Sequence, residues 1–323
     1  MGIEYATFFP PLLLSKKGIS VKTKRVFLMC LLLAGPSSAE EVRPSGQLAV
    51  ATCQFPVSAD VQANGEWIRK QMREANLANA DVVHFCETAL CGYANVDHKS
   101  LECFDWQELH VQTDSVLQLA GELNLWMVLG SMHRLSEGHK PHNCLYVISP
   151  NGKVVDRYDK RFCTSGDLKH YSPGDHFVTF QINGVPCGLL ICYDVRFPEL
   201  HREYSKLGVR MIFHSFYNAR QKEGSIHPVI MPITARARAA TNNMFLSLSN
   251  SSAPRSWPCY MITPDGLVSG KLVDDEPGML VSQIDINRNY YDAAGAYRRD
   301  AIDGKLNSGT IVDDPRSQDR NSY

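Results

Sequence analysis

Hydrophobic positions follow two different periodicities along the chain, which predicts strands and helices in turn. Residues 47–54 (QLAVATCQ) form a short apolar run typical of a buried strand. Residues 60–80 repeat their apolar positions every three or four residues, which predicts a helix. The same reasoning predicts strands at 81–86, 125–132, 144–149, 153–158, 178–182, 186–191, 209–214, 245–249, 259–263 and 279–286, and helices at 106–123, 197–207 and 228–241.

This alternation indicates an α/β fold. Turn sequences at Pro150-Asn151-Gly152 and Asn183-Gly184 add antiparallel hairpins, so mixed sheets are expected. No change in composition and no internal repeat interrupts residues 47–286. We therefore expect a single domain over residues 40–323, with a polar C-terminal tail from about residue 287.

The first 39 residues resemble a secretory signal peptide. A cationic stretch ending at Arg25 precedes the apolar run 26–35 (VFLMCLLLAG). Small residues typical of a signal-peptidase cleavage site follow, with Ala39 as the expected cleavage point. This run is too short to span a bilayer, which needs about 20 apolar residues, so no membrane insertion is expected after cleavage. The alternative is an N-terminal core strand. Because the cationic region is long, the true start could also lie at Val21. Export to the periplasm or the extracellular space is expected if the leader functions, and a cytoplasmic location otherwise.

Composition excludes several classes of protein. The 323 residues are 44% hydrophobic and 21% charged, which excludes a disordered or fibrous chain. With 33 basic and 34 acidic residues, no cationic excess is present to neutralise nucleic acid. Removal of the leader leaves nine of the ten cysteines, an odd number that suggests at least one free thiol. Their spacing matches no zinc pattern, so no zinc site is expected.

Cys192 is the candidate nucleophile. In the segment GLLICYDVRFPEL, an apolar run ends at Cys192, and Pro198 stands where the first turn of a helix tolerates it. A helix N-terminus lowers the pKa of a nearby thiol and favours the nucleophilic thiolate. The alternative interpretation is a buried core cysteine, which is the commoner case.

Two further residues would complete a catalytic site. Glu87 ends a predicted strand and opens the sequence ETALCGY, and Lys160 follows another strand in YDKRFCT. In isolation each side chain is more often a solvated surface charge. Because ligands bind beyond the carboxyl ends of strands in α/β sheets, the three groups together could supply a base, an oxyanion stabiliser and a nucleophile.

The order Glu87, Lys160, Cys192 and the flanking sequences resemble the nitrilase superfamily of carbon–nitrogen hydrolases. The resemblance extends over about residues 48–286 and includes ITARARAATNNMFLSLSN and MITPDGLVSG. It implies a four-layer αββα sandwich that pairs into an eight-layer dimer, and cofactor-free hydrolysis of amide, carbamoyl or nitrile C–N bonds. The family often carries a second glutamate after the lysine. This chain has only Asp167 and Asp175 there.

The resemblance implies that Glu87 accepts the thiol proton, Cys192 attacks the carbonyl carbon and Lys160 stabilises the oxyanion. Tyr193-Asp194 after the cysteine is closer to the amidase-type branches, including omega-amidases and carbamoyl-amide hydrolases, than to nitrilases. The expected substrate is a small amide or carbamoyl amide. Alternatives are a nitrile substrate, an acyltransferase, a non-catalytic binding module or a Cys–His protease. Candidate substrate-binding residues are Tyr93, Tyr193, Phe216 and Tyr217, together with the neighbouring Asn95 and Asn218.

Overall fold

The structure is a computed structural model and describes residues 43–323. The predicted signal peptide, residues 1–39, lies outside the described residues, and so does the alternative start at Val21. Both therefore stay predictions. Within residues 43–323, no helix is both long enough and apolar enough to cross a bilayer.

Two six-stranded mixed sheets form the centre of the described chain. The first has the order β12 (Gly278–Asp285), β1 (Gln47–Gln54), β2 (Val82–His84), β3 (Trp126–His133), β4 (His142–Ile148), β5 (Val154–Asp159). The second has the order β11 (Val268–Lys271), β10 (Tyr260–Ile262), β9 (Phe245–Ser249), β8 (Met211–Ser215), β7 (Val185–Ile191), β6 (Thr179–Ile182). In each sheet three neighbouring strands are parallel, β1–β2–β3 and β7–β8–β9, and the remaining pairs are antiparallel.

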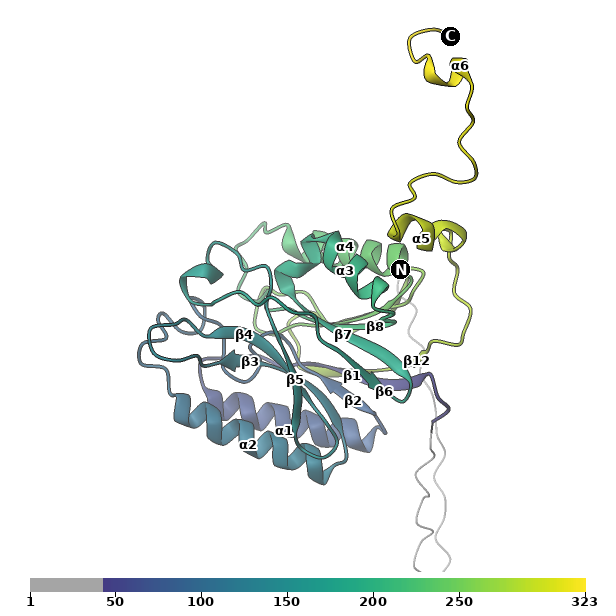
Figure 1. Cartoon of the computed structure of the whole chain (residues 1–323). Helices are drawn as coiled ribbons and strands as arrows, with labels where there is room; N and C mark the ends of the chain where they lie inside the picture. The colour runs from purple at the N-terminus through teal and green to yellow at the C-terminus, as the bar shows by residue number, and fades with distance from the viewer. Residues whose placement is uncertain (1–42) are drawn as a thin grey trace, which may run out of the picture. The chain divides into compact units, whose positions relative to one another are not determined.

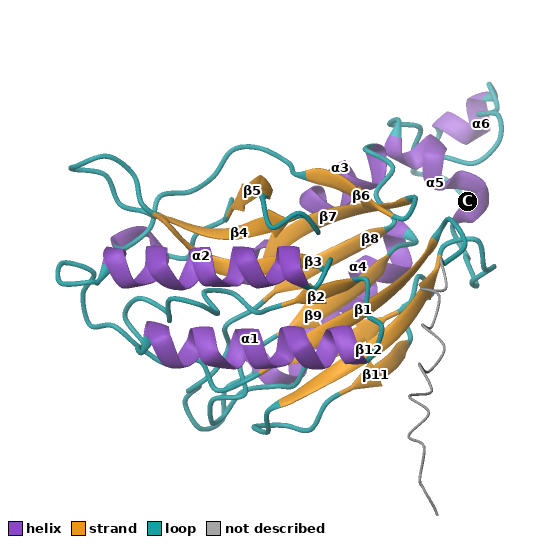
Figure 2. Cartoon of the chain, turned by 90° about the horizontal axis from the view of Figure 1, so that it is seen from below, coloured by secondary structure: helices purple, strands orange, loops and turns teal. Residues whose placement is uncertain are grey.

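Helices cover the outer face of each sheet (Figure 1). The pair α1 (Val61–Leu77) and α2 (Trp106–Glu122) lies side by side across the first sheet, as Figure 2 shows from below. The pair α3 (Pro198–Lys206) and α4 (His227–Asn242) covers the second sheet. The result is the four-layer αββα sandwich that the resemblance implied. Shorter helices are η1 (Asp167–Lys169), η2 (Cys192–Arg196), α5 (Gly295–Ile302) and α6 (Pro315–Gln318).

Local sequence sets where the long helices begin. The Asp60 side chain accepts a hydrogen bond from the Ala63 amide at the start of α1, and Asp105 does the same for Glu108 in α2. Pro198 occupies the first turn of α3, as predicted, because that position needs no amide donor. These caps explain why the predicted helix starts agree with the structure to within a residue or two.

Five short elements were missing from the predicted strands and helices, namely β11, α5, α6, η1 and η2. The edge strand β11 is short and mostly exposed, so it has no alternating apolar pattern. The polar tail contains α5, and none of the residues of this helix is buried. Arg298 of α5 pairs with Asp292 and donates to the backbone oxygen of Thr241 at the end of α4. Tertiary contacts of this kind leave no periodic signal in the sequence.

The two sheets face each other through a mainly apolar core that also contains a polar cluster around His84. The His84 ring contacts the hydroxyl oxygens of Ser247 and Ser215 at 2.8 and 2.9 Å, and Thr52 contacts Ser247 at 2.6 Å. Burial lowers the pKa of His84 to about 3, so its ring is neutral and can donate one hydrogen bond and accept another. This cluster fixes how β1 and β2 of one sheet face β8 and β9 of the other.

Gly130 of β3 lies against the backbone of the segment that follows β2, and only a residue without a Cβ atom fits there. A Cβ atom at this position would lie 1.8 Å from the carbonyl oxygen of Cys86 and 2.8 Å from the Thr88 amide. We expect Gly130→Ala to lower the free energy of unfolding by about 1–3 kcal/mol, measured by urea denaturation, because the backbone must move. Gly121→Ala in α2 is the matched control, since its Cβ would meet atoms no closer than 3.5 Å. Equal stability of the two variants would contradict this interpretation.

Candidate active site

The three predicted catalytic residues converge between the two sheets. Glu87 lies just after β2, Lys160 directly after β5 and Cys192 directly after β7. Strands β2 and β5 run in the same direction, because β5 is separated from β3 by one antiparallel strand. Their carboxyl ends therefore meet at one edge of the first sheet, opposite the end of β7.

Lys160 is the charged centre of this site. Its side chain is fully buried, and its Nζ lies 2.7 Å from Glu87 Oε1 and 2.9 Å from Asp167 Oδ2. Burial alone would lower the pKa of Lys160, but the neighbouring anionic groups, Glu87 first, raise it well above its ordinary value. The amine is therefore held as an ammonium ion between two carboxylates.

Glu87 is held as a carboxylate by several donors. Besides Lys160, the side-chain amide of Asn143 donates to Oε1 at 2.7 Å, and the backbone amide of Tyr217 donates to Oε2 at 2.9 Å. Burial nevertheless raises the pKa of Glu87, and the Asp167 carboxylate raises it further, while Lys160 opposes both. A carboxylate whose pKa is raised is a better general base than an ordinary glutamate.

Cys192 lies on a sharp turn between β7 and η2. Its φ of +43° is in the left-handed region, which a non-glycine residue occupies only when its surroundings hold it there. Asp194 supplies such contacts, because its carboxylate accepts from the Ile191 amide, the Phe162 amide and the Tyr158 hydroxyl at 2.9–3.0 Å. It thereby fastens the turn to the segment that carries Lys160.

The expectation that a helix N-terminus lowers the pKa of Cys192 is wrong. The residue begins a short 3₁₀ turn, and α3 starts only at Pro198. Burial and the nearby Glu87 carboxylate raise the thiol pKa, and they outweigh the opposing effects of Lys160 and Asn218. The resting site therefore holds a neutral thiol beside a carboxylate that can accept its proton.

The four candidate substrate-binding residues have different environments. The Tyr93 ring stacks on Tyr217 at 5.0 Å and lies 5.8 Å from Lys160 Nζ. Tyr193, next to the cysteine, is 36% exposed and packs edge-on against Phe197. Phe216 differs from the expectation, because its side chain is fully buried in the core. Its backbone oxygen accepts from the Glu87 amide at 3.2 Å.

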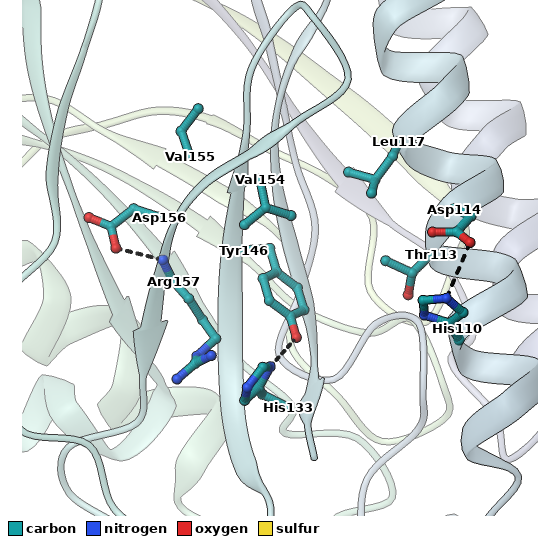
Figure 3. Close-up of a pocket in the computed structure, with 10 residues that line it drawn as sticks. All are labelled: His110, Thr113, Asp114, Leu117, His133, Tyr146, Val154, Val155, Asp156 and Arg157. Carbon is teal, nitrogen blue, oxygen red and sulfur yellow. Dashed lines mark hydrogen bonds and ion pairs between the residues drawn. The ribbon is translucent and has the colours of Figure 1, made fainter. Parts of the chain in front are cut away.

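A separate hollow of about 440 Å³ lies between α2 and strands β4 and β5 (Figure 3). Its lining includes His133, whose ring contacts the Tyr146 hydroxyl at 2.9 Å, but none of Glu87, Lys160 or Cys192. No cluster of His, Cys, Asp and Glu side chains among residues 43–323 could hold a metal ion. The nine cysteines in this part of the chain are free thiols.

Comparison with known proteins identifies the family. Residues 49–293 match the carbon–nitrogen hydrolase family, which is well over half of the chain. The chain belongs to the carbon–nitrogen hydrolase family. The predicted resemblance is therefore confirmed at the level of the family, and the site described above lies entirely within the matched residues.

Several curated proteins are similar to this carbon–nitrogen hydrolase. An (R)-stereoselective amidase from a Pseudomonas sp. is 29% identical over 53% of this chain and 59% of the relative. A hydrolase in the agr operon of Staphylococcus lugdunensis is 30% identical over 65% of this chain and 89% of the relative. An omega-amidase of Homo sapiens is 26% identical over 54% of this chain and 67% of the relative. Three of the curated relatives are matched over only 59%, 30% and 53% of their own length.

Solved structures share the fold. An amidase from Nesterenkonia sp. superposes with a TM-score of 0.65 at 21% identity, over 76% of this chain and 92% of that chain. A variant of the Nesterenkonia sp. AN1 amidase, with acrylamide added to its active-site cysteine, gives a TM-score of 0.67 at 19% identity. It covers 79% of this chain and 98% of that chain. At this level of identity the likeness shows the αββα architecture.

Of the two aspartates that closely follow Lys160 in the sequence, Asp167 is the one that lies against the Lys160 ammonium. Its carboxylate accepts from Lys160, from the Thr164 amide at 2.9 Å and from the Tyr93 hydroxyl. Burial raises its pKa, but Lys160 and these hydrogen bonds lower it overall, so it stays ionised. The other candidate, Asp175, has a fully exposed side chain, and its Oδ1 lies 3.8 Å from His176 Nδ1.

The sequence analysis named Asn218 only as a neighbour of the candidate substrate-binding residues, and it did not single out Asn143 as a member of the site. Asn143 is a fully buried polar residue in the apolar strand β4, and such a residue needs a hydrogen-bond partner inside the protein. Its place in a strand beside the Lys160 strand was the available signal. The Asn218 side chain contacts the Cys192 sulfur at 3.3 Å, across 26 residues of sequence, and no sequence pattern joins them.

The electrostatic arrangement predicts the pH dependence of activity. Glu87 acts as a base only when ionised, so kcat/KM should fall as the pH falls through its raised pKa. In Asp167→Asn the nearby negative charge is lost, which lowers that pKa, while the amide can still accept from Lys160. We expect the acidic limb of the profile to move to lower pH. Asp175→Asn is the control and should leave the profile unchanged. A profile that did not move in Asp167→Asn would show that the two carboxylates do not interact.

Proposed function

We propose that this chain hydrolyses a small non-peptide amide or carbamoyl amide through a thioester on Cys192, and releases ammonia or an amine. The observation that carries the proposal is the geometry of the site. A thiol on a strained turn lies at the end of β7, beside a buried ion pair between Glu87 and Lys160 at 2.7 Å. The family membership of residues 49–293 supports a carbon–nitrogen bond as the target.

The residues divide the reaction between them. Glu87 accepts the thiol proton as the Cys192 sulfur attacks the carbonyl carbon, and Lys160 stabilises the negative charge that develops on the oxygen. Glu87 then protonates the nitrogen, the C–N bond breaks and a thioester remains. Water gives a proton to Glu87 and attacks the thioester. The C–S bond breaks, and the leaving sulfur takes that proton back from Glu87, which regenerates the thiol and the carboxylate. Because the resting thiol is neutral, its proton must move to Glu87 before or as the sulfur attacks.

The neighbouring aromatic rings support a small, uncharged substrate. Tyr93 and Tyr217 stack on each other beside Lys160, and Tyr193 stands next to the nucleophile. The Lys160 charge is already paired with two carboxylates, Glu87 and Asp167, so it offers no free positive charge to a substrate carboxylate. The relatives include amidases, one of them an omega-amidase, and an amidase in the same fold carries acrylamide on its active-site cysteine.

Ammonia release from a panel of small amides, carbamoyl amides and nitriles tests this function. We expect release from amides without any added acceptor amine, and at least a thousandfold loss of the rate in Cys192→Ala, roughly the effect of removing a nucleophile. Release from nitriles alone would instead indicate a nitrilase. Product formed only with an acceptor amine would indicate an acyltransferase, and activity retained in Cys192→Ala would overturn the proposal.

Lys160→Gln is a less clean variant for this test. Removing the ammonium leaves Glu87 and Asp167 buried next to each other without their counterion, and breaking a buried ion pair costs about 3–5 kcal/mol. Loss of activity in Lys160→Gln would therefore combine loss of oxyanion stabilisation with loss of stability. Cys192→Ala removes no charge from the resting site.

We also propose that the protein forms a homodimer in which two sandwiches stack into eight layers. Ile226, Val229 and Ile233 are apolar, 52–65% exposed and spaced along the outer side of α4. Exposed apolar surface of this kind is typical of an interaction site. Pairing of two such α4 faces would bury these side chains and place the helix layers of both sandwiches together.

Val229→Lys tests the dimer. A charge introduced into an apolar interface is costly, so we expect the mass measured by sedimentation equilibrium to fall from that of a dimer to that of a monomer. Val155→Lys is the matched control. Val155 is also about half exposed, but it lies on β5 of the first sheet, whereas α4 covers the second sheet. If both variants keep the dimer mass, the interface does not involve this face of α4.

A further inference from the structure

The Cys192 sulfur has a hydrogen-bond donor that the mechanism above does not use. The Nδ2 atom of Asn218 lies 3.3 Å from Cys192 Sγ. Asn218 follows β8 and is 5% exposed, so water has little access to its side chain. This amide is the neutral polar group that touches the reacting atom itself.

Trp257 fixes which end of the Asn218 amide faces the sulfur. The indole Nε1 donates to Asn218 Oδ1 at 3.2 Å. An indole nitrogen can only donate, so the amide oxygen must face Trp257 and the NH₂ group must face Cys192. A flipped amide would place two donors against each other and leave the sulfur next to an oxygen. The orientation of Asn218 is thus determined chemically, without reference to the sulfur.

Asn250 holds both partners in place from the end of β9. Its Oδ1 accepts from the Asn218 backbone amide at 3.0 Å, and its Nδ2 donates to the Trp257 backbone oxygen at 2.8 Å. The Trp257 ring also packs edge-on against Phe216 at 4.8 Å. Asn250, Trp257 and Phe216 are all buried. The donor is therefore positioned before any substrate binds.

We propose that Asn218 is a catalytic residue that stabilises the Cys192 thiolate, and that Trp257 is the positioning residue that directs it. This inference rests on the proposed thioester chemistry. When the thiol proton moves to Glu87, the sulfur becomes anionic and its hydrogen bond from Asn218 becomes charge-assisted, and thus stronger. The bond weakens when the sulfur is acylated. It strengthens again when water attacks the thioester and the C–S bond breaks, so Asn218 assists both formation of the nucleophile and its departure.

Alkylation of Cys192 by iodoacetamide, followed over a range of pH, tests this role without any amide substrate. Because a hydrogen bond to a charged group contributes about 1.5–3 kcal/mol, Asn218→Ala should slow alkylation at neutral pH by on the order of 10–100-fold. Its pH profile should also move to higher pH. Trp257→Phe keeps the aromatic packing but removes the N–H, so we expect a smaller change in the same direction. Trp126→Phe, in β3, is the matched control and should alkylate as the unaltered protein does.

The outcomes separate this inference from the proposed function. Unchanged alkylation rates and pH profiles in both Asn218→Ala and Trp257→Phe would overturn the role of Asn218, whatever the enzyme hydrolyses. If Asn218→Ala loses its fold, judged by near-ultraviolet circular dichroism, Trp257→Phe alone decides the question. Ammonia release that persists in Cys192→Ala would instead overturn the proposed function and leave the alkylation results standing as a property of the thiol.

Discussion

The buried ammonium of Lys160 is the charge on which the arrangement of the site depends. It contacts Glu87 and Asp167 at 2.7 and 2.9 Å, and all three side chains are almost completely removed from water. A buried charge is tolerated only when it is paired and hydrogen-bonded. The three charges therefore hold together three segments of the chain: the one after β2, the one after β5 and the short helix η1. No sequence pattern joins these segments.

The need to pair and hydrogen-bond these buried charges explains why polar groups surround the site. Asn143, the Tyr217 amide and the Thr164 amide donate to the two carboxylates, and the Tyr93 hydroxyl completes the set. Each donor comes from a different segment, so the site can form only when both sheets are assembled. The catalytic geometry therefore forms together with the folded sandwich. A buried polar network that is only partly hydrogen-bonded is less favourable than an apolar core without such a network.

The nucleophile is controlled by a balance between burial and nearby charges. Burial and Glu87 favour the neutral thiol, while Lys160 and Asn218 favour the thiolate. A neutral resting thiol suits an enzyme whose base lies beside it, because the thiolate then forms only as the base accepts the proton. The turn at Cys192, with φ of +43°, stores backbone strain that Asp194 offsets by tying Ile191 and Phe162 together.

The sequence by itself determined the α/β class, nearly every long element and the three candidate catalytic residues, because periodicity, caps and strand ends are local properties. It also pointed to Asp167 as one of two carboxylates able to replace a glutamate. Only the tertiary structure decided between Asp167 and Asp175, since one is buried against Lys160 and the other is exposed. It also decided the core position of Phe216, the raised pKa of Cys192 and the contact from Asn218. These depend on burial and on contacts between distant segments, which arise only when the two sheets pack together.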